Sequence, residues 1–293
     1  MKLETKNRRN NRAVSPVIST VIITATIIAL VTVAVVFANN FLSARLAESD
    51  FNASKQFMQT LGLQIDDVAW RMGQTETIRY SSRYGDINIL SNVNLNYTIE
   101  IKTLENPSAY QVFYTNKTRF AFFYMPISKY TVSNNYFEQI WPAKVSTLTL
   151  KGSSASTSTV FAVEKMPMSD GNYVRVVTAP VVRVINSTIA TATNSTFYFK
   201  LYLPILSLDS APKKSQSVTL TGDSVSVKTK SHITSIRISV YFPQAPDFDN
   251  TFFHFSSVQE VINAPSGFPA LPTKDCVIEL YTGAVSASLG ANV

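Results

Sequence analysis

The feature that most constrains the fold is a run of uncharged, mostly apolar residues near the N-terminus. No Asp, Glu, Lys or Arg occurs between Ala13 and Ala44, and the central part reads VISTVIITATIIALVTVAVVFANNF, from Val17 to Phe41. About 20 helical residues suffice to cross the roughly 30 Å hydrocarbon core of a bilayer. Helices of soluble proteins rarely remain apolar on all faces over such a length. We therefore predict a membrane-spanning helix.

The charges on either side of this run predict its orientation. The preceding flank is basic, with Lys2, Lys6, Arg8, Arg9 and Arg12 against Glu4, whereas the following flank is balanced, with Arg45, Glu48 and Asp50. Because basic flanks remain on the cytoplasmic side, the chain beyond residue 45 is expected outside. Ser15 is suited to cap the helix, and Pro16 fits its first position, where a missing N–H costs nothing.

Charge and cysteine content exclude some classes of protein. The net charge is +7, of which the basic flank supplies +4 (five basic residues minus one acidic), leaving +3. The rest of the chain therefore lacks the large excess of basic residues that is typical of proteins that bind nucleic acid. The single cysteine, Cys276, excludes an intramolecular disulfide. We interpret it as a small buried apolar residue.

The junction between the basic flank and the apolar run resembles that of archaeal type IV pilins. A short leader ends in Arg12-Ala13, and VSPVISTVIITATIIALVTVAVV follows from Val14, so that the resemblance covers about residues 8–40. It implies that a prepilin peptidase cuts the leader between Ala13 and Val14. It further implies a helical homopolymer built through N-terminal helices, an assembly ATPase, a membrane platform protein and a role in adhesion.

A helical pattern continues beyond the apolar run. Apart from Ser54, the positions that recur every three or four residues are apolar, namely Phe51, Met58, Leu61, Ile65, Val68 and Met72. This helix stripe is one face of an amphipathic helix. Gly62 weakens it by roughly 1 kcal/mol and suggests a bend, and Gly73 fits its end. We predict one long helix over residues 14–73, more than an anchor requires.

From Glu76 onward the period changes from 3.6 to 2. In VNLNYTIEIK (93–102) apolar and polar residues alternate, as in a half-buried strand. Further strands are predicted near 77–81, 110–114, 119–125, 145–150, 159–163, 173–178, 180–185, 197–203, 217–221, 224–229, 236–242 and 277–281. Many short strands favour antiparallel sandwiches. The predicted class is α+β: leader 1–13, long hydrophobic helix 14–73, and an extracellular β-rich domain 74–293, undivided or split near the linker-like KGSSASTST (151–159).

Candidate modification sites are five Asn-x-Ser/Thr sequons, at Asn52, Asn96, Asn116, Asn186 and Asn194. Asn96 lies on the polar face of its predicted strand, and Asn116 lies where a turn is expected. With Asn186 and Asn194 they are predicted to be accessible on an extracellular domain. Asn52, beside the helix stripe, is expected to be crowded in a filament.

Nothing in the sequence nominates catalytic, cofactor-binding or metal-binding residues. His232 and His254 are isolated, so neither has metal-site spacing. Asp247 and Asp249 form a D-x-D that we interpret as a loop turn rather than a calcium site. The aromatic and basic stretch YTNKTRFAFFYMPISKY (114–130) is read as strand core rather than a base-stacking surface. We predict a protein that is not an enzyme and binds no nucleic acid.

These observations lead to one hypothesis and several alternatives. The precursor is expected in the cytoplasmic membrane with its N-terminus inside, and the mature chain outside in a surface filament. A subunit of the archaellum, the motility filament, is the nearest alternative. A membrane-anchored extracellular binding module that never polymerises is another, and an extracellular enzyme is a third.

Overall fold

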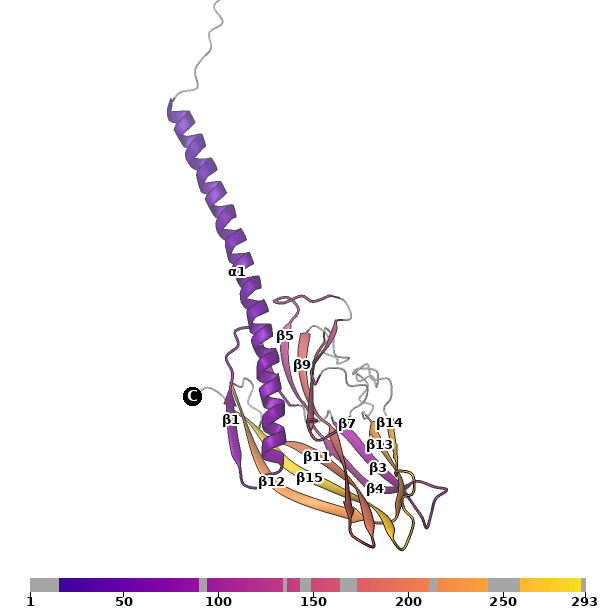
Figure 1. Cartoon of the computed structure of the whole chain (residues 1–293). Coiled ribbons are helices and arrows are strands. Elements are labelled where there is room, and N and C mark those ends of the chain that lie inside the picture. The colour runs from indigo at the N-terminus through magenta and orange to yellow at the C-terminus, as the bar shows by residue number, and fades with distance from the viewer. Residues whose placement is uncertain are drawn as a thin grey trace, which may run out of the picture. The chain divides into compact units, whose positions relative to one another are not determined.

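The computed structural model describes residues 16–89, 94–133, 136–142, 149–163, 173–210, 216–241 and 259–290 (Figure 1). It contains one long N-terminal apolar helix followed by a β-rich domain, which confirms the predicted fold class. The chain divides into two compact units, Met1–Leu46 and Ala47–Val293. All strands belong to the second unit.

Helix α1 runs from Pro16 to Ala69 and has 54 residues. At a rise of 1.5 Å per residue it is roughly 81 Å long. It ends four residues before the predicted end at residue 73. Met72 is 76% exposed, so the helix stripe stops at Val68. The chain turns just after Ala69, with Arg71 N–H donating to Val68 O at 3.1 Å. Gly73 then adopts a φ of 80°, which favours glycine.

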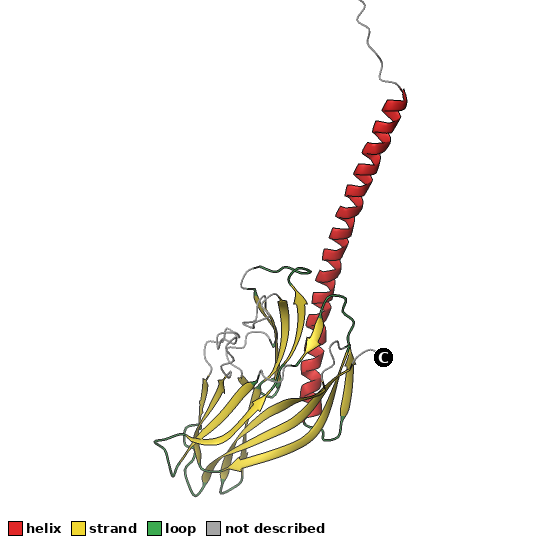
Figure 2. Ribbon diagram, turned by 180° about the vertical axis from the view of Figure 1, so that it is seen from behind, coloured by secondary structure: helices red, strands yellow, loops and turns green. Residues whose placement is uncertain are grey.

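Among the described residues, fifteen strands form three sheets (Figure 2). The six-stranded sheet has the order β1 (Thr75–Arg79), β12 (Ser217–Lys230), β15 (Lys274–Gly290), β11 (Ser195–Ser210), β10 (Val182–Ala190), β7 (Thr149–Lys151). The four-stranded sheet has the order β14 (Gln259–Asn263), β13 (Ile233–Tyr241), β3 (Leu95–Thr103), β4 (Gln111–Thr118). The five-stranded sheet has the order β2 (Asp86–Asn88), β5 (Ala121–Pro126), β9 (Tyr173–Pro180), β8 (Ser158–Val163), β6 (Phe137–Trp141).

Pairing is antiparallel except at two places in the six-stranded sheet. There β11 runs parallel to β15, and β7 runs parallel to β10. Strand β12 was predicted as two strands, 217–221 and 224–229. It is one strand whose register shifts between Gly222 and Ser224. A β-bulge bends a strand without ending it, so the break in the sequence pattern is a bulge rather than a turn.

The second unit contains two hydrophobic cores that share the six-stranded sheet. The first lies between the four-stranded sheet and residues such as Phe199, Leu201 and Ile278 of the six-stranded sheet. The second core is formed around residues 47–69 of α1. It includes residues of the five-stranded sheet, the beginning of β12 and the end of β15. The linker-like stretch 151–159 ends in β8, and its last four residues, Ser156, Thr157, Ser158 and Thr159, are buried.

An ion pair between neighbouring strands gives the fold a measurable pH dependence. Glu100 of β3 lies opposite Arg237 of β13, whose Nε donates to Glu100 Oε2 at 2.6 Å. That hydrogen bond, partly opposed by burial, lowers the pKa of Glu100. A carboxyl group whose pKa is lowered by folding stabilises the fold above its unfolded pKa, and the contribution is lost as pH falls through the folded pKa.

We therefore expect Glu100→Gln to lower the melting temperature at pH 7. The difference from the wild-type protein should shrink as the pH falls below about 4, because the wild-type carboxyl then also becomes neutral. Thermal unfolding of both proteins at pH 7, 5, 4 and 3 measures this. A difference of equal size at pH 7 and pH 3 would show that the carboxylate charge is not responsible.

Candidate functional site

The most unusual surface of the described chain is the apolar segment, which we define as residues 17–42 of α1. Every residue of α1 before Ala47 is at least partly exposed, and the helix is long and apolar enough to cross a membrane. Its exposed large apolar residues are Val17, Ile18, Val21, Ile22, Ile23, Ile27, Ile28, Leu30, Val31, Val33, Val35, Val36, Phe37, Phe41 and Leu42. They leave no polar face.

Burial energetics indicate that water is not the environment of this segment. Burying one Val, Leu, Ile or Phe side chain contributes about 1.5–3 kcal/mol, so the segment as a whole gains on the order of tens of kcal/mol on leaving water. The segment must therefore be covered by something apolar. Lipid and other helices of the same kind both meet this requirement.

The threonine side chains within the segment satisfy their own donors. The hydroxyl groups of Thr20, Thr24 and Thr32 donate to carbonyl oxygens of the preceding turn at 2.8–2.9 Å. Thr26 donates to Ile22 O at 2.5 Å. Hydroxyl groups paired in this way can enter a dry environment without leaving a donor unsatisfied. These four threonines therefore add little polar cost when the segment moves between two apolar surroundings.

The helix stripe is the face of α1 that packs in the second unit. Phe51, Met58, Leu61, Ile65 and Val68 are each 0% exposed. They pack against the five-stranded sheet and the six-stranded sheet in one core, and Figure 1 shows this part of α1 between β5 and β9 on one side and β12 and β15 on the other. Residues 47–69 are therefore held by the β-rich domain itself.

Glycines bring the helix and the sheets close together. A Cβ atom on Gly62 of α1 would lie 3.3 Å from Ser158 Cβ of β8 and 3.4 Å from Thr178 Cγ2 of β9. Thr178 also donates to Met58 O at 2.9 Å. The sequence suggested a bend at Gly62, whereas the structure shows a residue that allows close approach. A Cβ on Gly283 of β15 would lie only 2.1 Å from Ala69 O.

Two charged residues beside the helix stripe also hold the helix, and sequence reasoning did not single them out. Asp50 Oδ2 accepts from the backbone N–H of Arg83 at 2.7 Å and of Tyr84 at 3.1 Å, so it fixes the loop after β1. Lys55 pairs with Glu138 of β6. Their partners are more than 30 residues away in the chain, and no local pattern indicates such contacts.

The predicted residues of leader cleavage, Arg12, Ala13 and Val14, lie outside the described residues, as does Ser15. Pro16 is the first residue of α1, at the position where its missing N–H costs nothing.

The predicted glycosylation sites differ in accessibility. Asn52, Asn116, Asn186 and Asn194 are exposed. Asn96 is half-buried, and its Oδ1 is buried with no hydrogen-bond partner among the described residues. The cause is that β3 is an interior strand, so Asn96 is flanked by Lys117 of β4 and Tyr241 of β13. Asn96 is therefore a poorer acceptor than its place on the polar face suggested.

The remaining titratable candidates are dispersed. His254, Asp247 and Asp249 lie outside the described residues, and His232 Nε2 lies 3.9 Å from Asp275 Oδ2. Within the described ranges, no group of three metal-ligating side chains occurs. Cys276 is buried in the first core, and burial, together with the charge of Asp275, raises the pKa of its thiol to about 12.

This burial predicts an unreactive thiol. Because the thiolate is the nucleophile, native protein should not react with N-ethylmaleimide at pH 8, whereas unfolded protein should take up one equivalent. Mass spectrometry of native and guanidinium-treated samples measures the uptake. Ser224→Cys, at an exposed position of β12, is the control and should label in the native state. Native labelling of Cys276 at a comparable rate would contradict its burial.

Comparison of the chain with protein-family models, with curated proteins and with solved structures found no match. The functional argument therefore rests on the apolar segment and on the helix stripe, which packs in the β-rich domain.

Proposed function

We propose that this chain is a structural subunit of an archaeal type IV pilus-like surface filament, which serves adhesion. The observation that carries the proposal is the dual character of α1. Its apolar segment is exposed on all faces, and the same uninterrupted helix continues into the helix stripe, which is buried in the β-rich domain. Such a helix can pack among copies of itself while each copy holds its own domain.

The proposed sequence of events begins in the cytoplasmic membrane, where the precursor sits with its basic leader inside. A prepilin peptidase removes residues 1–13 and leaves Val14 as the new N-terminus. An assembly ATPase and a platform protein then transfer the subunit into the growing filament. These partners and the cleavage position follow from the resemblance of residues 8–40 to archaeal type IV pilins, and the β-rich domain forms the outer wall.

The physical basis of assembly is an exchange of one apolar environment for another. In the bilayer, lipid covers the apolar segment, and in the filament, neighbouring apolar segments do so. Without a hydrophobic difference between the two, packing decides the balance. Small residues four apart, such as Ala25 with Ala29 and Ala34 with Ala38, allow helices to approach closely. The internally bonded Thr side chains do not oppose the exchange.

Two alternatives use the same helix. An archaellum subunit would share the leader and the assembly route, and motility of cells lacking the chain distinguishes it. A membrane-anchored binding module would keep the apolar segment in lipid permanently. The anchor needs no cleavage before Val14, so the fate of the leader separates it from the filament subunit.

The experiment is to replace Ala13 with Glu at the proposed cleavage position and to image filaments by electron microscopy. We expect unprocessed chain in the membrane and no filaments containing it. Asn7→Glu places the same charge within the leader, away from the junction, and should leave processing normal. Normal filaments from the Ala13→Glu variant would overturn the cleavage assignment.

A further inference from the structure

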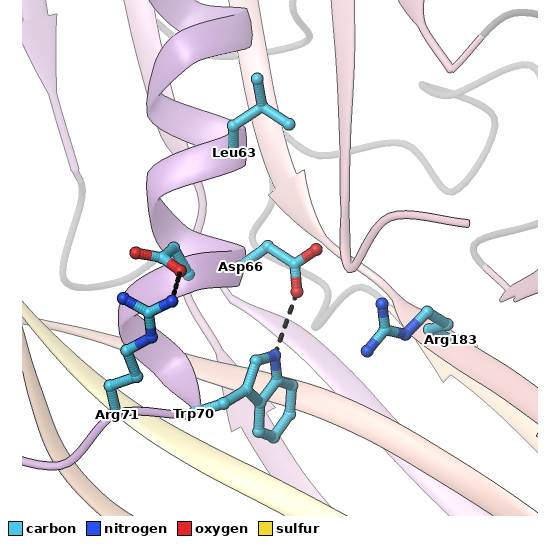
Figure 3. A pocket seen from close by; sticks show the side chains of 6 residues that line it. Leu63, Asp66, Trp70, Arg71 and Arg183 are labelled. Carbon is cyan, nitrogen blue, oxygen red and sulfur yellow. Dashed lines mark hydrogen bonds and ion pairs between the residues drawn. The ribbon is translucent and has the colours of Figure 1, made fainter. Parts of the chain in front are cut away.

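An open hollow of about 470 Å³ lies where the end of α1 meets the six-stranded sheet, and the filament role does not use it. It is lined by Leu63, Asp66, Asp67, Trp70, Arg71 and Arg183 (Figure 3). Two carboxylates and two guanidinium groups make its formal charge zero. Asp67 and Arg71 are paired with one another at 3.1 Å, so Asp66 and Arg183 are the groups left to face a ligand.

Asp66 is a fixed hydrogen-bond acceptor. Its Oδ1 accepts from Trp70 Nε1 at 3.0 Å and from Thr157 Oγ1 at 2.7 Å. These two bonds hold the carboxylate and the indole in place. Its Oδ2 has no hydrogen bond to any residue that the structure describes. A carboxylate held through one oxygen presents the other in a defined direction.

Arg183 is a fixed donor on the opposite side. Its guanidinium lies over the Tyr202 ring, 4.7 Å from the centroid, and Nη1 donates to Ala155 O at 3.3 Å. Its Nε is buried and has no hydrogen-bond partner within the described part of the chain. Figure 3 shows Arg183 and Asp66 facing one another across the hollow with no bond drawn between them.

We propose that this hollow binds a neutral saccharide. A sugar hydroxyl group is both donor and acceptor, so neighbouring hydroxyls can donate to Asp66 Oδ2 and accept from Arg183. The C–H face of a sugar ring can pack on the partly exposed indole of Trp70. The zero net charge disfavours acidic polymers, and the wide opening suits the end of a glycan chain better than a small enclosed molecule. The site does not depend on polymerisation.

The test uses the full chain, produced in a host that does not glycosylate its sequons and dissolved in a polyoxyethylene detergent. Maltoside and glucoside detergents are avoided because their headgroups are saccharides. The probes are immobilised neutral oligosaccharides of mannose, glucose and galactose, with uronate and sulfated oligosaccharides as charged comparators. Free glycine and lysine test a zwitterionic ligand, which Asp66 and Arg183 would also fit. The Trp70 fluorescence in a Trp141→Phe background reports on occupancy.

We expect binding to at least one neutral oligosaccharide and a change in Trp70 fluorescence. Asp66→Asn can still accept from Trp70 and Thr157 but replaces Oδ2 with a donor, and should weaken binding about tenfold. Arg183→Lys retains the positive charge but not the planar guanidinium group, and it should weaken binding to a similar extent. This variant provides the test if Asp66→Asn does not fold. Asp209→Asn, at an exposed position of β11 outside the hollow, is the control and should bind normally.

Three results would overturn the proposal. The first is absence of binding to every neutral oligosaccharide. The second is stronger binding of glycine, lysine or the charged oligosaccharides. The third is equal binding by the folded Asp66→Asn or Arg183→Lys variant and the wild-type protein. Because binding is measured on unassembled protein, each result is independent of whether filaments form.

Discussion

Replacing Gly283 with Ala should destabilise the β-rich domain by about 3 kcal/mol or more, among the larger effects of a single methyl group. The new Cβ would lie 2.1 Å from Ala69 O and 2.8 Å from Ala69 C. Backbone atoms cannot rotate away as a side chain can. The end of α1 would have to move off β15 and give up part of the second core. Chemical denaturation in detergent, followed by circular dichroism, measures the loss.

Gly62→Ala is the matched control, since it adds the same methyl group where the helix meets the other sheet. There the nearest contacts are side-chain atoms at 3.3 Å and 3.4 Å. The gain in helix propensity, about 1 kcal/mol, offsets the crowding. We expect its stability to stay within about 1 kcal/mol of the wild-type protein. A Gly283→Ala variant as stable as Gly62→Ala would contradict the close contact between α1 and β15.

Replacing Val31 with Arg should abolish incorporation of the chain into filaments while leaving it in the membrane. A bilayer accepts one Arg near the centre of a long apolar helix at about 2.5–3.5 kcal/mol, because the side chain can reach toward the interface. A packed helical core offers no such route, and an unpaired buried charge costs several kcal/mol in every subunit. Immunoblots of the membrane fraction and of sheared extracellular material measure the distribution.

Val227→Arg on β12 is the control for this variant. Val31 and Val227 are 55% and 54% exposed, so the same substitution is made at equally accessible valines. Only Val31 belongs to the surface proposed to enter the filament core. The Val227→Arg chain should therefore reach the sheared fraction as the wild-type chain does. Normal amounts of Val31→Arg chain in filaments would favour an anchor that does not polymerise.

The periodicity of the sequence was sufficient to predict elements whose surroundings follow the same pattern along their whole length. The apolar run and the stripe from Phe51 to Val68 predict α1, because both surroundings repeat every turn. Strand β3 alternates strictly between buried and half-buried residues, and the sequence shows the same alternation. The Thr hydroxyl bonds of the apolar segment also follow from local spacing, since each acceptor lies three or four residues earlier.

The sequence did not predict the features that depend on residues far away in the chain. Strands β2, β6 and β14 were not predicted. Each is an edge strand, β6 and β14 contain no buried residue, and β2 contains only Ile87. Strands β11 and β15 extend well beyond the predicted segments because they span both cores. The small, polar Ser156–Thr159 stretch resembles a linker, but it is buried. Ser158 in this stretch lies so close to Gly62 of α1 that a Cβ atom on the glycine would be 3.3 Å from Ser158 Cβ.

The candidate site was predictable in part for the same reason. The apolar segment is visible in the sequence because exposure to lipid or to like helices demands apolar residues at every position. The hollow between Asp66 and Arg183 was not visible, since its two sides are more than 100 residues apart in the chain. Trp70 directly after the helix stripe was the one local signal for it, because a large aromatic residue at a helix end needs a nearby partner.

The most direct test of the filament proposal is the N-terminal sequence of the chain in material sheared from the cell surface. The proposal predicts that the chain is found in sheared filaments and that its sequence begins at Val14, with residues 1–13 removed. A chain that is recovered only from membranes, or that still begins at Met1 in the sheared material, would contradict it.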